Sequence, residues 1–514
     1  MSETKKLIDG KSSFSNKFDS DNLDNFLKAY LKQYLNGTVT ICNFTISHLL
    51  YYRIKLGFFF LILIHLIFKV IDDFEFEWEN RNMCLEKDPI WMIDERIDLG
   101  RQILCKSPNS THFCYKNTLE NYQSDKGVIC KMKNFTLDPS KWQSVNSDFK
   151  GPIEYKLRGL PLVSKGLFNM KCGIEKSLED VNNMYDFYFN AWNYTSNATD
   201  YRTREKRYKE LAPEKHVFFV SRNNDTSNLF LAGSAFLNAY IIMKSFYINP
   251  EEIQIVFLES FNITDDPFYD LYKELISRGA DPVHISNLNK KYFISSAINI
   301  PLNWDSPLFI FTQIPKCRKQ TKTFDLLNES IKDYLELKKF RDSIGYNHEI
   351  FYYPKSIVNP NSKTYKKFVT IQWRKAFPKG RTGQQRLLGN GPELAEALAE
   401  KLPKNILIRL VDTAHLPIKE QIALMKKTDF FIGEHGAGLF LSIFLPTKAV
   451  VQEILHKDNI NVFQLLSSLS GHVTYSNIIK ARVEMIDENE VLFFDIKHFT
   501  KVVLTHMKKN NYLS

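Results

Sequence analysis

Short apolar runs alternate with helical periods through most of the chain. Residues 216–221 (HVFFVS) and 253–260 (IQIVFLES) read as strands, and residues 229–248 between them have a helical pattern, which is the spacing of a β-α-β unit. From residue 366 the alternation becomes more regular. The later elements are KKFVTIQW, a helix led by Pro392 and ending at Leu402, NILIRLVD, a helix over 418–428, DFFIGEHGAGL and AVVQEIL. The pattern predicts an α/β protein with two Rossmann-like halves and parallel sheets.

A single apolar segment, residues 56–71 (LGFFFLILIHLIFKVI), is a candidate membrane anchor. As a helix it would reach about 24 Å at ~1.5 Å per residue, which is short for a bilayer but sufficient for a thin membrane. Arg53 and Lys55 precede the segment and acidic residues follow it, so residues 1–55 are expected to be cytosolic and the rest lumenal. The alternative is a buried core helix.

The cysteines agree with an oxidising compartment beyond the anchor. Only Cys42 precedes the segment, and an even set of six follows, with fifteen possible pairings. The six candidates for disulfides are Cys84, Cys105, Cys114, Cys130, Cys172 and Cys317. Acceptor triplets for N-glycosylation lie on the same side, at Asn109, Asn134, Asn193, Asn197, Asn224, Asn262 and Asn328. Residues 72–140 hold four of these cysteines and few apolar periods, which predicts a stem or cap.

Composition and charge exclude several classes of protein. A hydrophobic content of 44% and a charged content of 25% are those of an ordinary globular chain. The net charge of +10 is spread along the sequence without basic runs, so nucleic acid is not an expected partner, and the positive charge favours an anionic ligand. No metal site stands out, because Asp265 and Asp266 are adjacent rather than spaced and the histidines are scattered.

The strongest local signal is the glycine-rich turn Gly433-Glu434-His435-Gly436-Ala437-Gly438-Leu439. It lies between an apolar strand and an apolar helix, so its backbone can approach a ligand closely at a helix N-terminus. That arrangement can hold a pyrophosphate. The alternative is a turn that only allows tight packing of strand against helix.

Basic side chains gather upstream of this turn. Arg374, Lys375, Lys379, Arg381 and Arg386 follow the strand that ends at Trp373, and they could neutralise phosphates without a metal ion. The alternative is a solvated basic loop.

A carboxylate interrupts the last strand of the pattern. Glu453 lies in the apolar run AVVQEIL and needs a partner, either a ribose hydroxyl or a neighbouring basic side chain.

Residues 373–455 resemble glycosyltransferase family 61. The resemblance rests on an arginine after the strand, RLLGN leading into Glu393-Leu394, HLPIKEQ, FIGEHGAGL and a strand glutamate. Within that family, PKGRTGQQRLLGN and residues 415–421 look most like the core N-glycan β-1,2-xylosyltransferases. A looser match covers Asn228-Leu229-Phe230 and Asn238-Ala239-Tyr240.

The resemblance implies a type II, single-pass Golgi or endoplasmic reticulum enzyme of GT-B form, with residues 141–350 on the acceptor side and 351–514 binding the nucleotide sugar. It would transfer a sugar from UDP, with inversion and without a further cofactor, to an N-glycan or glycoprotein. Xylose is the first donor it suggests, and N-acetylglucosamine the second. The resemblance implies Arg374, Glu434 and His435 for catalysis. On the acceptor side it implies Asn228 and Tyr240. The implied donor-site residues are Arg374, Arg386, Asn390, Gly433, His435, Gly436, Ala437, Gly438, Leu439 and Glu453.

Two positions depart from the family pattern. Leu231 and Ala235 stand where the family usually has a histidine and an aspartate. Asp225, Glu259 and Asp265 are nearby replacements for a catalytic base, although loop carboxylates of this kind are more often simply solvated. The departures also motivate a different hypothesis, an anchored UDP- or glycan-binding protein without catalysis.

Overall fold

The computed structural model describes residues 101–115, 129–144, 162–174, 191–195, 208–222, 228–259, 266–300, 322–337, 349–357, 359–375, 386–456 and 462–513. The chain divides into two units, Met1–Glu77 and Trp78–Ser514, and all the described residues lie in the second. The predicted anchor over 56–71 lies outside them. None of the helices in the described ranges is long and apolar enough to span a bilayer.

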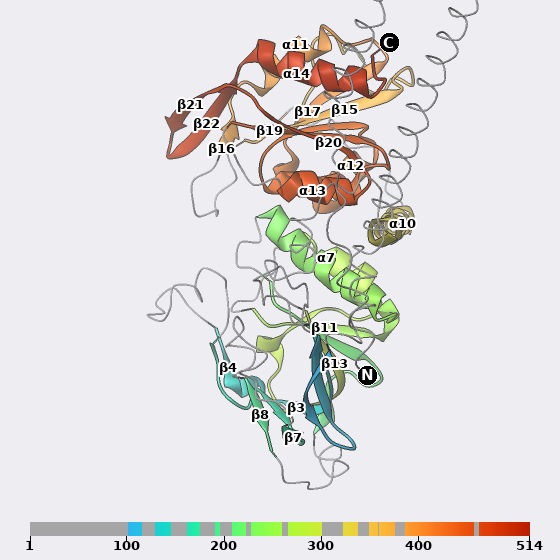
Figure 1. The fold of residues 1–514 in the computed structure, drawn as a ribbon, viewed down its shortest axis with the longest axis vertical. Helices are drawn as coiled ribbons and strands as arrows, with labels where there is room; N and C mark the ends of the chain where they lie inside the picture. Colours follow the sequence, from blue (N-terminus) through green and yellow to red (C-terminus); the bar gives the residue numbers. More distant parts are fainter. Residues whose placement is uncertain are drawn as a thin grey trace, which may run out of the picture. The chain divides into compact units, whose positions relative to one another are not determined.

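The first half of the described chain is built on one eleven-stranded sheet (Figure 1). Four strands run parallel in the order β12-β11-β10-β13, so the predicted β-α-β unit is present, with α7 as its crossover helix. Beyond β13 the sheet continues in antiparallel pairings through β3, β2, β1 and β7. The bounds are β9 (Lys209–Glu210), β10 (His216–Val220), α7 (Leu229–Ser245), η3 (Pro250–Glu252), β11 (Ile253–Phe257), α8 (Tyr269–Leu271), η4 (Tyr272–Ile276), β12 (Val283–His284), η5 (Ile285–Asn287), β13 (Tyr292–Ile300) and α10 (Lys322–Leu337).

The segment expected to form a separate stem contributes strands to this same sheet. Strand β3 pairs with β13 along most of its length, so the predicted boundary at residue 140 falls inside one structural layer. Disulfides join Cys105 to Cys172 and Cys114 to Cys130, while Cys84 and Cys317 lie outside the described residues. The strands and turn are β1 (Arg101–Lys106), β2 (Thr111–Tyr115), β3 (Ile129–Leu137), η1 (Pro139–Lys141), β4 (Trp142–Gln143), β5 (Leu162–Val163), β6 (Phe168–Met170), β7 (Gly173–Ile174) and β8 (Trp192–Tyr194).

The second half has a six-stranded sheet in the order β14-β17-β15-β18-β19-β20, parallel except for β14. Figure 1 shows α11 and α14 on one side of it and α12 and α13 on the other, which makes it doubly wound. A small sheet, β16-β22-β21, adjoins it. The bounds are β14 (Phe351–Tyr352), β15 (Lys367–Gln372), β16 (Arg386–Leu388), α11 (Gly391–Ala399), β17 (Ile406–Val411), η8 (Thr413–His415), α12 (Ile418–Lys426), β18 (Phe430–Glu434), η9 (Ala437–Phe444), β19 (Val450–Leu455), α13 (Val462–Leu469), β20 (Val473–Ile478), β21 (Ala481–Ile486), β22 (Asn489–Phe494) and α14 (Ile496–Lys509).

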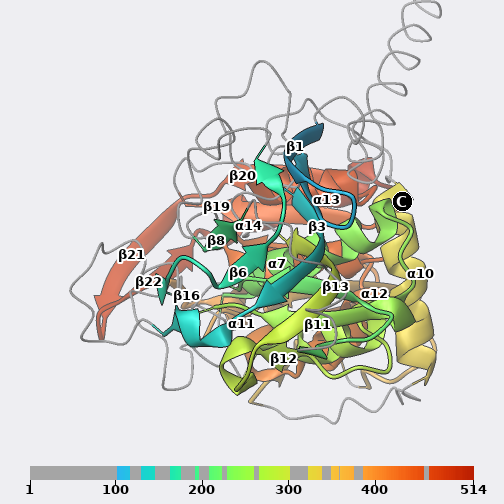
Figure 2. The ribbon, with the colours of Figure 1, turned by 90° about the horizontal axis from the view of Figure 1, so that it is seen from below.

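Helix α7 connects the cores of the two halves. It packs on the parallel strands β10 and β13 of its own sheet (Figure 2) and also against η9 of the second half. Gly233 makes the second contact possible, because a Cβ at this position would lie 2.1 Å from the Phe440 ring. The apolar side chains of α7 and η9 therefore belong to one buried cluster.

Candidate functional site

The candidate site forms where the strand order of the second sheet reverses. Strand β15 is flanked by β17 on one side and by β18 on the other, and Gln372 pairs with Val411 while Ile371 pairs with Ile432. Loops leaving the carboxyl ends of these strands diverge at this switch point, where ligands bind in open α/β sheets. Arg374 follows β15 at this edge, and the glycine-rich turn follows β18.

Two arginines share one buried carboxylate at this edge. Arg374 Nη1 donates to Glu434 Oε2 at 3.2 Å and to the His435 carbonyl at 3.2 Å. Arg386 Nη1 lies 3.6 Å from the other carboxylate oxygen of Glu434. The Glu434 side chain is only 2% exposed, whereas those of Arg374 and Arg386 are 20% and 25% exposed. Glu434 thus has the geometry of a residue that positions two partly exposed cations, which can attract an anion.

A second polar chain runs across the next two strands. His435 Nδ1 lies 2.6 Å from Glu453 Oε1, and Ser476 Oγ donates to Glu453 Oε2. Both oxygens of Glu453 are therefore occupied, and the carboxylate is nearly inaccessible. Of the two partners considered for Glu453, the structure provides the neighbouring side chain. Nδ1 of His435 is fixed by Glu453, so Nε2 is the ring nitrogen left for a ligand.

The three glycines of the turn differ in what surrounds them. A Cβ on Gly436 would lie 2.7 Å from Arg374 Nη1, so this glycine lets the guanidinium pack over the backbone. A Cβ on Gly438 would lie 1.7 Å from Gln372 Nε2, and one on Gly433 would lie 2.7 Å from a Leu439 methyl. Gly433 and Gly438 therefore pack against buried side chains, while Gly436 faces the candidate site.

The remaining donor-site predictions fall into two groups. Ala437 begins η9 at the site, whereas Leu439 is fully buried in the core. Asn390 exchanges hydrogen bonds with the Phe494 backbone, at 2.9 Å and 3.1 Å, so its amide ties the start of α11 to β22.

Part of the basic loop can also be placed. Lys375 Nζ lies 3.8 Å from the centre of the Trp373 ring and donates to the Glu349 carbonyl. Lys379 and Arg381 lie outside the described residues.

Sequence reasoning missed Ser476, Gln372 and Phe463. Ser476 becomes recognisable only through strand pairing, since β20 places it beside Glu453. Gln372 ends β15, is buried, and donates to Thr413 Oγ1 at 3.0 Å. Phe463 contacts His435 edge to face, with ring centres 5.2 Å apart, and it contacts Phe230 of α7 at the same distance. The start of α7 therefore reaches the candidate site through one aromatic ring.

The acceptor-side residues have structural roles in the described part of the chain. Asn228 caps α7 by accepting a hydrogen bond from the Leu231 amide at 3.3 Å. Tyr240 is fully buried, and its hydroxyl lies 2.9 Å from Ser330 Oγ. Leu231 and Ala235 are buried in the same helix. Because Tyr240 is inaccessible, it does not contact an acceptor in this conformation.

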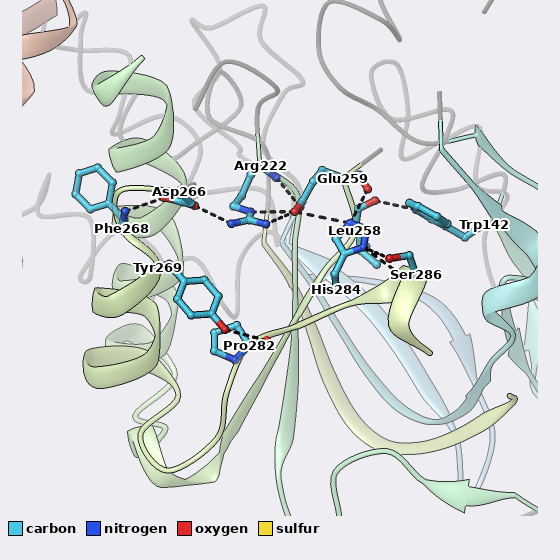
Figure 3. A network of polar contacts seen from close by, with 10 residues as sticks. All are labelled: Trp142, Arg222, Leu258, Glu259, Asp266, Phe268, Tyr269, Pro282, His284 and Ser286. Atoms are coloured by element: carbon cyan, nitrogen blue, oxygen red, sulfur yellow. Dashed lines mark hydrogen bonds and ion pairs between the residues drawn. The ribbon is translucent and has the colours of Figure 1, made fainter. Parts of the chain in front are cut away.

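Glu259 differs from the exposed loop carboxylate that the sequence suggested. It has no exposed surface, and Arg222 lies between it and Asp266, donating to Glu259 Oε1 at 3.0 Å and to Asp266 Oδ2 at 2.9 Å (Figure 3). Burial raises the pKa of Glu259, and the Arg222 guanidinium opposes that shift. His284 closes the other side by contacting the Glu259 carbonyl at 3.1 Å. Glu259 is therefore unavailable as a base, and Asp225 and Asp265 lie outside the described residues.

One group of metal-ligand residue types occurs within the described ranges, formed by His112, Cys114 and Cys130. The two cysteines are joined in a disulfide, so they offer no thiolate to a metal ion. Burial lowers the pKa of His112 to about 3, and its Nδ1 lies 2.7 Å from the Tyr194 hydroxyl. The group is structural.

Four of the glycosylation candidates can be placed. Asn109 is exposed in the turn after β1, and Asn134 donates to its carbonyl. Asn193 donates to Asn169 Oδ1 at 3.1 Å. Asn328 lies inside α10 and accepts a hydrogen bond from Lys426 Nζ at 2.6 Å. Asn197, Asn224 and Asn262 lie outside the described residues.

Comparison with known proteins supports the family resemblance. Residues 236–452 match the family model described as Glycosyltransferase 61. Proteins named EGF domain-specific O-linked N-acetylglucosamine transferase are similar over short stretches. The one from Drosophila melanogaster is 36% identical over 64 residues, which is 12% of each chain. Those from Xenopus laevis and Gallus gallus are 36% and 34% identical over 93 residues, which is 18% of this chain and 17% of the relative in both cases. Residues 236–452 thus resemble a glycosyltransferase 61 domain, and the expectation of a glycosyltransferase is supported. The aligned stretches span less than a fifth of each relative.

A solved structure, the metal-soaked Flv1 flavodiiron core from Synechocystis, matches with a TM-score of 0.18 and 10% identity over 74% of this chain and 94% of that chain. A likeness this low carries no argument about fold or function.

Proposed function

We propose that this protein is an inverting glycosyltransferase of GT-B form that transfers a sugar from a UDP-sugar to a hydroxyl of a glycoprotein or its glycan. The observation that carries the proposal is the pair Arg374 and Arg386, held by Glu434 beside the glycine-rich turn. This cluster has two positive charges and one negative charge, and it lies where a doubly wound sheet binds phosphates.

In the proposed reaction the acceptor oxygen attacks the anomeric carbon while the bond from that carbon to the phosphate oxygen breaks. Negative charge then grows on the departing UDP. The guanidinium of Arg374 and the Nε2 side of His435 lie where they can stabilise that charge, because Glu434 and Glu453 already fix their orientation. The proton of the acceptor goes to a carboxylate base, for which Asp225 and Asp265 stay candidates from the sequence alone.

The two candidate donors rest on different grounds. The names of the similar proteins favour N-acetylglucosamine, and the residue pattern over 378–390 and 415–421 suggests xylose. We place N-acetylglucosamine first, because three relatives carry that donor in their names.

The compartment is proposed from the sequence. The charge asymmetry around residues 56–71 and the cysteines beyond them suggest a lumenal enzyme, anchored in the Golgi or endoplasmic reticulum by one N-terminal helix.

The full-length protein, incubated with UDP-N-acetylglucosamine or UDP-xylose and a mixture of glycoproteins, tests the proposal. Transfer from either donor, with loss on Arg374→Ala, is expected. UDP binding without transfer to any acceptor would favour the alternative, a non-catalytic UDP- or glycan-binding protein. That alternative is motivated by Leu231 and Ala235, which are buried in α7 and offer no acid or base.

A further inference from the structure

A second polar cluster lies on the other side of β15, at the same edge of the sheet. Asp412 directly follows β17, one residue past the last pair of that strand with β15, Gln372 with Val411. On the opposite side Glu434 ends β18, two residues past the last pair of that strand with β15, Ile371 with Ile432. Because adjacent strands lie about 4.8 Å apart, the ends of β17 and β18 are roughly 10 Å apart. A nucleoside diphosphate is long enough to span that interval.

The cluster is a carboxylate-oriented histidine. His415 Nδ1 lies 2.6 Å from Asp412 Oδ2, and the Asp412 side chain is 2% exposed while that of His415 is 36% exposed. In a neutral imidazole whose Nδ1–H donates to a carboxylate, Nε2 is a hydrogen-bond acceptor. Among the described residues, nothing occupies that acceptor. Within the described ranges Asp412 Oδ1 is also buried and makes no hydrogen bond of normal geometry, although the Ala414 amide lies close enough to the carboxylate to lower its pKa.

The charges around this dyad favour the ionised form of Asp412. Burial raises the pKa of Asp412, and the contact with His415 and the charge of Lys375 oppose that shift. Thr413, between the two residues of the dyad, accepts a hydrogen bond from Gln372, which packs beneath the glycine-rich turn. The dyad is therefore connected to the proposed phosphate site through buried contacts.

On the far side of the turn the corresponding polar group is already used. Glu453, the strand carboxylate that could have received a ribose hydroxyl, is occupied by His435 and Ser476. In doubly wound sheets the ribose contacts a polar residue at the end of a strand near the phosphate-binding turn. The dyad is such a group, and it has an open acceptor.

We propose that the Asp412–His415 dyad binds the ribose of the donor nucleotide, with a ribose hydroxyl donating to His415 Nε2. This inference rests on the proposed function, because it takes UDP as the ligand of the adjacent turn. Asp412 is then a positioning residue that orients the imidazole, and His415 contributes to recognition of a ribonucleotide.

Calorimetric titration of the full-length protein with UDP, 2′-deoxy-UDP and 3′-deoxy-UDP tests the inference. The wild type should bind UDP about threefold to tenfold more tightly than at least one deoxy analogue, which is the net value of one hydrogen bond. His415→Ala should remove that ratio, and His415→Gln should keep part of it, because its amide oxygen still accepts. His498→Ala, an exposed histidine of α14, is the matched control and should keep the ratio.

Three results would overturn the inference. If His415→Ala still binds UDP more tightly than the deoxy analogues by the wild-type ratio, His415 does not contact the ribose. Unchanged UDP affinity with loss of transfer would assign the histidine to the acceptor side. A wild-type protein that binds no UDP would overturn the proposed function, and the inference with it. If Arg374→Ala weakens UDP binding while His415→Ala changes neither the UDP affinity nor the ratio of UDP to deoxy-UDP affinities, the ribose contact is wrong and the proposed function stands.

Discussion

Replacing Arg374 by methionine separates the binding role of the arginine from its structural role. The substitution keeps an unbranched apolar stem but removes the guanidinium that contacts Glu434 and the His435 carbonyl. Among the described residues Glu434 would then keep only Arg386 as a cationic partner, at 3.6 Å, while its side chain stays almost inaccessible to water. Two losses are therefore expected, one in stability and one in affinity for UDP.

The structure sets the size of both losses. A hydrogen bond to a charged group is worth about 1.5 to 3 kcal/mol, so the uncompensated carboxylate should lower stability by about 2 kcal/mol. Loss of one preorganised donor to the departing phosphate should cost about 2 to 4 kcal/mol of transition-state stabilisation, or roughly thirtyfold to a thousandfold in kcat/KM. Lysine at the same position should recover only part of this, because a point charge does not reproduce a fork of donors.

A second substitution distinguishes the two losses. Glu434→Gln removes the buried charge, so the Arg374→Met/Glu434→Gln double variant should regain most of the lost thermal stability and none of the UDP affinity. Thermal unfolding and calorimetric titration of UDP give the two readouts. Arg482→Met, in an exposed ion pair of β21, is the control and should change neither. A double variant that recovers UDP binding would refute direct contact between Arg374 and the diphosphate.

Further outcomes can be measured independently. Gly436→Ala should weaken UDP binding while the protein stays folded, because the new methyl group contacts only a flexible guanidinium. Gly438→Ala should instead lower the unfolding temperature, because its methyl group collides with buried Gln372. Equal unfolding temperatures for the two variants would contradict this difference. A chelator should change the transfer rate by less than about twofold if the arginines replace a metal ion, and strict dependence on added Mn²⁺ would reject that role. Protein made in a secretory pathway should carry a glycan at exposed Asn109 and none at Asn328, as glycopeptide mass spectrometry would show.

Periodicity predicted the elements of the second half well, because each strand there is a short apolar run with its own turn signals. Strands β15, β17, β18 and β19 all lie within the runs identified from the sequence. Their order in the sheet did not follow from periodicity, since that order depends on long-range pairing. Ser476 shows the consequence, because only the pairing of β19 with β20 brings it to Glu453.

The first half was harder to predict from sequence for a related reason. Strands β1 to β3 are short and rich in cysteine, so they resembled a stem, yet β3 completes the sheet by pairing with β13. Glu259 was misjudged because a carboxylate after a strand is usually solvated. Arg222 makes its burial possible, and the partner lies 37 positions earlier in the chain.

The polar side chains at the carboxyl edges of the two sheets differ in burial, and this difference bears on where a ligand would bind. In the first sheet, the strand ends carry Arg222, Glu259 and His284, which contact one another and leave Glu259 without exposed surface. In the second sheet, Arg374 and Arg386 stay partly exposed while the carboxylate that holds them is buried. A closed ion-pair network stabilises loops, whereas partly exposed cations beside a buried carboxylate can attract an incoming anion. This difference supports the proposal that the second half binds the phosphates, and the start of α7 in the first half reaches the candidate site through Phe463.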